Sequence, residues 1–376
     1  MIIGIDGNEA NTDRRVGIGE FAFELINQFG ENNDNGLTFQ IYLKNKPKDD
    51  LPEQNKEWKY QVFGPKKAWT QFALPVNLFL KKPRPSVFFT PSHYAPRFSP
   101  VPTVISLMDL SYIHFPELFT KKDLYQLKNW TAYSVKKAQR IFTISNASKN
   151  DIIKVYHIAE DKIDVLYPGI KTTMHLEPHI YPMNELQSKY GIGKEYILFV
   201  GTLQPRKNIK RLIEAFSQIV KQKEHVNLQL VIVGKKGWQY EEIIAAPALY
   251  EVSSSVKFLD FVEDADLALL YSHAICYVLP SLYEGFGLPV LEAMKHDCPV
   301  ITSNVSSLPE AGGDAALYVN PTDTKDIAKK IAMLVTDKDL RKELIQKGRK
   351  QVEKFSWEKT AQKALSILEE VGKVSS

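Results

Sequence analysis

The chain has 376 residues, 44% hydrophobic and 24% charged, which is typical of a globular protein and excludes a disordered one. Its longest apolar runs are far shorter than the ~20 residues that cross a bilayer, and its two cysteines exclude a disulfide framework and a four-cysteine metal site. The net charge of +4 is too small to indicate nucleic-acid binding. Because Met1 leads directly into strand-like sequence, we expect no signal segment and a cytoplasmic location.

In the first half, short β-branched apolar runs alternate with helical patterns. The predicted strands are residues 2–6, 38–43, 87–90, 103–107, 141–145 and 163–166, with a helix at 20–29. Continuous apolar runs that end in Gly, Pro, Ser or Asp are typical of parallel strands covered on both faces.

The second half repeats this alternation. The predicted strands are residues 196–201, 228–233, 256–259, 274–279 and 300–303. A helix is predicted at 208–224, with Asn208 as its N-cap, and another at 356–371. The pattern predicts an α/β protein of two doubly wound Rossmann-like domains that face a central cleft. We expect the boundary between Pro168 and Glu195, in a stretch that contains two further prolines and reads as a connection followed by a short helix.

A glycine-rich loop precedes the first predicted helix. Gly17 and Gly19 leave backbone N–H groups open at a helix start, which suits an anion. The segment matches the dinucleotide pattern only formally, because the glycines lie eleven residues beyond Asp6. A plain flexible loop is an equal alternative.

Two loops of the second half carry stronger patterns. Arg206 and Lys207 stand just before the 208–224 helix, where two cations and a helix start suit a diphosphate; the alternative is a pair of exposed bases. In the second loop, glycines at 285 and 287 allow close approach to the N–H groups of Phe286, Gly287 and Leu288. If the chain were helical between them, Glu284 and Glu292 would lie 80° apart and face one cleft, as a sugar ligand requires. The alternative is a capped helix with incidental acids.

The excess positive charge lies in residues 1–170, which hold 22 Lys and Arg against 18 Asp and Glu. Part of it, at residues 66–67 and 81–84, flanks the apolar segment 69–80. Such a face can contact an anionic membrane, and a solvated helix face is the plainer alternative.

Glu284-Gly-Phe-Gly-Leu-Pro-Val-Leu-Glu292 resembles the E-x7-E motif of the family 4 retaining glycosyltransferases, a group with the GT-B fold. Further similarities are Gly17-Ile-Gly19, Ser145-Asn-Ala-Ser148, Pro168-Gly-Ile170 and Gly201–Asn208, so the resemblance covers nearly the whole chain. It implies an acceptor-binding domain at 1–170, onto which the helix at 356–376 packs back, and a nucleotide-sugar-binding domain at 171–355.

The resemblance also implies roles for single residues. Arg206 and Lys207 would hold the donor diphosphate, Glu284 with Phe286, Gly287 and Leu288 the hexose, and Glu292 the ribose, while Val262 would lie near the base and Gly17 and Gly19 would border the donor. Family members with this pattern usually read His-Asp-Leu where this chain has Met108-Asp109-Leu110. A thioether cannot replace a histidine in proton transfer or hydroxyl binding. Asp109 is therefore a catalytic candidate, and His93 and His114 are possible substitutes.

These features predict a retaining, mannosyltransferase-like enzyme that moves a hexose from a nucleotide diphosphate sugar to a glycan or lipid-linked acceptor. The resemblance points to mannose and GDP-mannose, with no cofactor and no essential metal. Peripheral contact with the inner membrane face is a further expectation. A related protein that binds nucleotide or glycan without turnover is the main alternative, because of Met108, and a nucleotide-sugar epimerase is a weaker one.

Overall fold

The structure is a computed structural model that describes residues 1–31, 36–170, 183–222 and 225–374. The chain divides into two compact units, Met1–Gly169 with Phe355–Ser376, and Ile170–Lys354. These limits lie one residue from the expected 1–170, 356–376 and 171–355. Each unit is described by itself below.

The first unit is built on a sheet of parallel strands in the order β3-β2-β1-β4-β5-β6-β7. The strands are β1 (Ile2–Asp6), β2 (Thr38–Leu43), β3 (Trp58–Val62), β4 (Val87–Thr90), β5 (Thr103–Ser106), β6 (Arg140–Thr143) and β7 (Ile163–Val165). The helices are α1 (Ile18–Glu31), α2 (Ala73–Leu80), α3 (Ser111–His114), α4 (Lys121–Lys137), α5 (Asn146–Tyr156) and α14 (Trp357–Val374).

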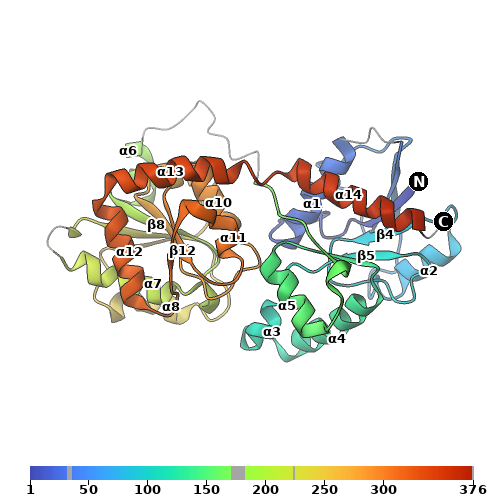
Figure 1. The fold of residues 1–376 in the computed structure, drawn as a ribbon, viewed down its shortest axis with the longest axis horizontal. Coiled ribbons are helices and arrows are strands. Elements are labelled where there is room, and N and C mark those ends of the chain that lie inside the picture. Colours follow the sequence, from blue (N-terminus) through green and yellow to red (C-terminus); the bar gives the residue numbers. More distant parts are fainter. Residues whose placement is uncertain (32–35, 171–182, 223–224, 375–376) are drawn as a thin grey trace. The chain divides into compact units, whose positions relative to one another are not determined.

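Helices cover both faces of this sheet, because neighbouring strand residues belong to different core clusters. Val104 packs with the buried face of α1 and α14. The next residue, Ile105, packs on the opposite side with Val135 of α4 and Ile152 of α5. The C-terminal helix α14 therefore completes the core of the first unit and lies beside α1 (Figure 1).

The second unit contains another parallel sheet, in the order β10-β9-β8-β11-β12-β13. Its strands are β8 (Tyr196–Val200), β9 (Gln229–Val233), β10 (Val256–Leu259), β11 (Cys276–Leu279), β12 (Val300–Ser303) and β13 (Ala316–Val319). Its helices are α6 (Met183–Tyr190), α7 (Ile209–Val220), α8 (Glu241–Leu249), α9 (Asp264–His273), α10 (Leu288–Lys295), α11 (Leu308–Gly312), α12 (Thr324–Thr336) and α13 (Lys338–Val352).

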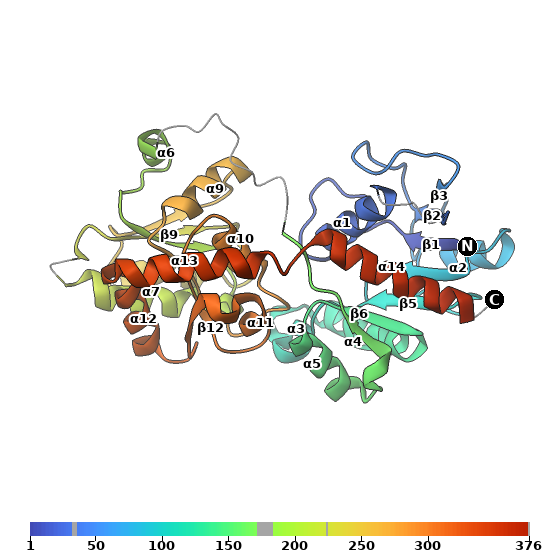
Figure 2. The same cartoon turned by 45° about the horizontal axis from the view of Figure 1, so that its top comes forward.

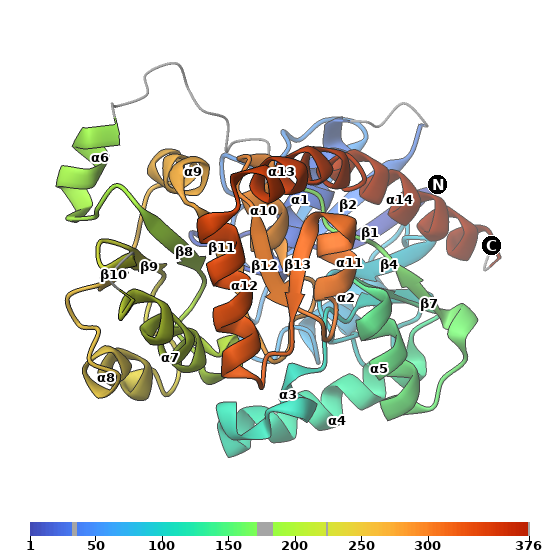
Figure 3. The same cartoon turned by 60° about the vertical axis from the view of Figure 1, so that its left-hand side comes forward.

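Helices of the second unit pair with one another around the sheet. Helix α10 packs on α13 (Figure 2), and α12 packs on α7 (Figure 3). All four residues of β11 and of β12 are buried, as expected for strands covered on both faces. The predicted α/β class with two doubly wound units is confirmed.

Most predicted elements are present with small shifts, and the differences have local causes. The predictions omit β3 and β13, both edge strands. The 208–224 prediction corresponds to α7, which ends at Val220, and residues 223–224 lie outside the described residues. Helix α6 lies in the connection predicted between Pro168 and Glu195. Residues 171–182 of that connection lie outside the described part of the chain.

Within the described residues, no helix has the length and apolar character needed to span a membrane.

Candidate functional site

The candidate site lies at the carboxyl ends of β8 and β11, which are neighbours in the second sheet. Ligands of open parallel sheets bind at this edge. The loop after β8 carries Arg206 and Lys207, and the loop after β11 carries Glu284. A backbone hydrogen bond from the Leu282 N–H to the Arg206 carbonyl (2.8 Å) joins the two loops. The fold thus brings together residues almost 80 positions apart.

Glu284 forms ion pairs with both cations of the β8 loop. The Lys207 Nζ donates to Glu284 Oε1 at 2.6 Å, and the Arg206 Nη1 donates to Oε2 at 3.0 Å. Ser281 Oγ donates to the same carboxylate at 2.7 Å. The side chains of Glu284 and Lys207 are only 7% and 10% exposed. The site is therefore a buried charge cluster with one surplus positive charge.

The electrostatics of this cluster keep Glu284 ionised. Burial by itself would raise the pKa of Glu284, but the charges of Lys207 and Arg206 and the hydrogen bonds from Lys207 and Ser281 lower it to about 2. Both carboxylate oxygens are thus hydrogen-bond acceptors at neutral pH. Such a cluster can bind phosphate oxygens through the cations and sugar hydroxyls through the carboxylate.

Asn208 is the N-cap residue of α7, as predicted, and it also fixes the end of the β8 loop. Its backbone has φ 61°, and its side chain makes no capping hydrogen bond to α7. Its amide nitrogen instead donates to the carbonyls of Pro280 (2.9 Å) and Pro321 (2.7 Å). The amide thus links the cationic loop to the Glu284 loop. Its hydrogen bonds also avoid the free-energy cost of burying the Pro280 and Pro321 carbonyls unpaired.

The chain is not helical between Glu284 and Glu292, so the predicted 80° relation does not apply. Helix α10 begins only at Leu288, because Gly287 before it has φ 102°. Pro289 lies in the first turn of this helix, where its missing N–H costs no intrahelical hydrogen bond. Phe286 is buried, and a Cβ on Gly287 would lie 2.7 Å from Leu308 Cδ2. The turn through residues 284–288 therefore requires glycine at 287 for both conformation and space.

Serines from the loop after β12 hold the backbone of this turn. Ser306 Oγ and Ser307 Oγ donate to the Glu284 carbonyl at 2.6 and 2.8 Å. These residues, with Ser281, are absent from the sequence-based site. Their only sequence clue is their position directly after buried strands, where sheet-edge ligands or supports are found.

Glu292 forms a hydrogen bond with the neighbouring helix α9. It is half-buried in α10, and Tyr271 of α9 donates to its Oε2 at 3.3 Å. Val262, the residue expected near the base, is 5% exposed, whereas Phe261 beside it is 82% exposed. The loop after β10 thus presents Phe261 rather than the Val262 side chain to solvent.

The remaining candidates belong to the first unit. Gly17 directly precedes α1, and Gly19 lies in its first turn. Asp109 follows β5 and accepts a hydrogen bond from the Ser111 N–H at 2.8 Å. Met108 packs against the core of the first unit. Both of these loops also lie at the carboxyl edge of their own sheet, since β1 and β5 end there.

His93, one of the two histidines considered as substitutes, interacts electrostatically with Asp109. Burial lowers the pKa of His93 to about 4, and the charge of Asp109 opposes this shift. His93 is therefore neutral at pH 7. His114 lies elsewhere, with its Nε2 3.0 Å from Asp151 Oδ2.

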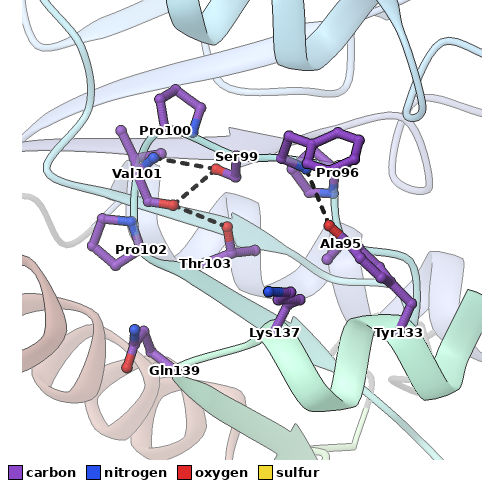
Figure 4. A pocket seen from close by; sticks show the side chains of 11 residues that line it. Ala95, Pro96, Ser99, Pro100, Val101, Pro102, Thr103, Tyr133, Lys137 and Gln139 are labelled. Carbon is purple, nitrogen blue, oxygen red and sulfur yellow. Dashed lines mark hydrogen bonds between the residues drawn. The ribbon is translucent and has the colours of Figure 1, made fainter.

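A different pocket of the first unit, of about 370 Å³, does not belong to this edge. It is lined by Pro100, Thr103, Tyr133, Lys137 and Gln139 among others (Figure 4). Thr103 starts β5 and Gln139 directly precedes β6, so the pocket lies at the amino end of the strands. Its Thr103 and Ser99 hydroxyls both donate to the Val101 carbonyl, as Figure 4 shows. This pocket is not the candidate site.

Comparison with known proteins places the chain in a family. The family model "Glycosyl transferases group 1" matches residues 183–351, and "Glycosyltransferase Family 4" matches residues 17–173. O-antigen chain mannosyltransferase B of Escherichia coli is 32% identical over 261 residues, which cover 68% of this chain and 67% of that protein.

Solved structures share the fold. Sucrose-phosphate synthase from Thermosynechococcus elongatus superimposes with a TM-score of 0.75 at 18% identity, over 99% of both chains. Anabaena HepE, solved in complex with UDP and glucose, gives 0.72 at 16% identity, over 98% of this chain and 99% of that one. Together with the family matches, these likenesses show that the chain is a GT-B enzyme and belongs to the group 1 glycosyltransferases of family 4.

Proposed function

We propose that the protein transfers mannose from a nucleoside diphosphate sugar to a hydroxyl of a glycan or lipid-linked acceptor, with retention of configuration. The buried Arg206–Lys207–Glu284 cluster carries this proposal, because it combines cations for a diphosphate with a carboxylate for sugar hydroxyls. The choice of mannose rests on the similarity to a protein named as a mannosyltransferase.

In the proposed reaction the acceptor oxygen attacks the anomeric carbon on the face from which the diphosphate leaves. The bond from that carbon to the phosphate oxygen breaks as the new glycosidic bond forms, and the acceptor proton passes to the departing phosphate. Arg206 and Lys207 stabilise the negative charge that grows on the leaving diphosphate. This route requires little acid–base chemistry from the protein, so Met108 is compatible with turnover.

We also propose that the first unit meets its acceptor at an anionic membrane surface, on the cytoplasmic face. Helix α2 and its neighbourhood expose apolar side chains around a groove of about 510 Å³. These side chains are Phe72, Val76, Phe79, Leu80 and Phe98. Arg97 lines the groove, and the Arg84 Cζ lies over the Phe79 ring, 5.8 Å from its centroid. Exposed apolar groups with adjacent cations favour an interface with anionic lipid.

A donor screen tests the enzymatic proposal. The thermal unfolding midpoint is measured with GDP-, UDP- and ADP-sugars, and release of nucleoside diphosphate is then measured with the stabilising donor. Binding raises the midpoint by mass action, so the preferred base is expected to give the largest shift and GDP-mannose to be turned over. Stabilisation by a donor without any nucleotide release would favour the non-enzymatic alternative.

A further inference from the structure

The loop between β9 and α8 packs directly against the cationic β8 loop. The Leu203 N–H donates to the Lys235 carbonyl and the Gly237 N–H donates to the Leu203 carbonyl, both at 3.0 Å. A Cβ on Gly237 would lie 2.7 Å from the Leu203 oxygen. The two loops therefore form one rigid backbone layer at the carboxyl edge of the sheet.

Gly234 at the end of β9 enforces the same close approach. Its φ is 152°, and a Cβ there would lie 2.0 Å from the Gly201 oxygen. Only glycine permits this contact. The position of the β9–α8 loop relative to Arg206 and Lys207 is thus set by backbone contacts.

This loop presents an indole ring to solvent. Trp238 is 61% exposed, although a tryptophan usually buries most of its large apolar surface. Lys235 and Lys236 before it are exposed cations, and the Lys236 Nζ lies over the Tyr240 ring at 5.4 Å. On the next strand outward, the loop after β10 exposes Phe261. Aromatic rings thus stand above two successive strands beside the cationic loop.

The strand order gives the direction in which a bound donor extends. Glu284 follows β11, on one side of β8, and Trp238 follows β9, on the other side. With the diphosphate at Arg206 and Lys207 and the hexose at Glu284, the nucleoside extends over β9 and β10. Neighbouring strands are only about 4.8 Å apart, so a base one or two strands away is within reach of a nucleoside diphosphate.

We propose that Trp238 forms one wall of the nucleobase site and stacks on the base of the nucleoside diphosphate donor. This inference rests on the proposed function. Aromatic rings stack on any base, and the adjacent Lys235 and Lys236 add positive charge on the phosphate side. Trp238 therefore supplies affinity for the nucleoside part of the donor and none for the phosphates.

Trp238 also provides its own spectroscopic probe. The five tryptophans of the chain are Trp58, Trp69, Trp130, Trp238 and Trp357. Only Trp238 falls in the second unit. Its fluorescence is therefore expected to be quenched by a stacked base and unaffected by inorganic pyrophosphate.

The test titrates GDP, UDP, ADP and pyrophosphate into the wild-type protein and three variants, by fluorescence and calorimetry. Trp238→Ala is expected to weaken the preferred nucleoside diphosphate by about fivefold or more while pyrophosphate affinity stays unchanged. Trp238→Tyr is expected to keep most of the affinity. Leu249→Ala is the matched control, because Leu249 is 64% exposed at the far end of α8 and should change nothing.

Two results would overturn the assignment. One is an affinity of Trp238→Ala for the nucleoside diphosphates that equals the wild-type affinity, even if the KM of the variant for the acceptor rises. The other is an equal loss of pyrophosphate affinity, which would mean a damaged loop. If the wild-type protein binds none of the nucleoside diphosphates, the proposed function itself fails.

Discussion

Glu284 is the residue on which the local electrostatics depend. Its carboxylate compensates two cations that are 10% and 20% exposed. Removing one member of a buried charge cluster leaves the others without compensation, which is far more costly than losing a surface ion pair. Glu284 thus has a structural role in addition to its proposed contact with the sugar.

Substitution of Glu284 by Gln predicts a pH-dependent loss of stability. The folded pKa of Glu284, about 2, lies below the usual glutamate value of 4.5, so the ionised carboxylate contributes stability above pH 4.5 that is lost as pH falls toward 2. We expect Glu284→Gln to lower the free energy of unfolding by about 3 kcal/mol at pH 7. Urea unfolding at pH 7 and pH 3 checks this, since the difference should shrink at pH 3. A pH-independent difference would contradict the assignment of the charge.

Gly287 predicts a second, conformational effect. Alanine there must adopt φ 102° and also meet Leu308 Cδ2 at 2.7 Å. We expect Gly287→Ala to cost about 1–3 kcal/mol in the free energy of unfolding and to reduce turnover. Gly191→Ala is the control, because Gly191 has φ 61° with nothing within 4 Å of a Cβ. Equal thermal unfolding midpoints for the two variants would remove the steric part of the explanation.

At the element scale, the sequence predicts the central strands and the edge strands β7 and β10, but it misses the edge strands β3 and β13. Central strands such as β11 are buried on both faces and read as continuous apolar runs. Strand β3 (Trp58–Val62) mixes buried and exposed positions at the sheet edge, and its Lys59 and Gln61 interrupt any apolar run. Its pairing with β2 depends on a contact that no local pattern encodes.

The site was partly predictable for a similar reason. Arg206, Lys207 and Glu284 lie in loops that follow apolar strands. Their location at the carboxyl edge of the sheet could therefore be predicted from local sequence. Their mutual ion pairs depend on the adjacency of β8 and β11, which is a property of the fold. The predicted 80° relation between Glu284 and Glu292 failed because the positive φ of Gly287 delays the start of α10 to Leu288.

The exposed apolar side chains of helix α2 predict a membrane interaction that can be measured with lipid vesicles. We expect the wild-type protein to sediment with vesicles rich in phosphatidylglycerol, in a salt-sensitive way, and not with neutral vesicles. Phe79→Ser with Leu80→Ser removes two exposed apolar groups and should abolish sedimentation. Leu249→Ser, in the second unit, is the matched control. Equal sedimentation of both variants would show that α2 is not the contact surface.

At the scale of the whole molecule, two α/β units, each built on its own parallel sheet, carry different candidate groups. The cationic cluster lies in the second unit, and Asp109 with His93 lies in the first. The C-terminal helix α14 joins the first core although it follows the second unit in sequence. The chain crosses between the units twice, a topology that composition and periodicity alone do not fix.

The charge of the whole site predicts independence from divalent cations. In the proposed donor complex, Arg206 and Lys207 would supply the positive charge that a metal ion provides in other phosphate sites. We expect turnover with excess EDTA to stay within about twofold of that with Mg²⁺. A loss of activity that added Mg²⁺ restores would contradict the proposal that the two side chains suffice.

The most direct measurement is the rate of nucleoside diphosphate release in single variants of the cationic pair. Loss of one charge-assisted contact to the leaving group predicts a drop of about tenfold or more for Arg206→Ala and for Lys207→Ala. Lys210→Ala, which removes an exposed cation paired with Glu242, should retain wild-type turnover. Full turnover in both Arg206→Ala and Lys207→Ala would contradict the account.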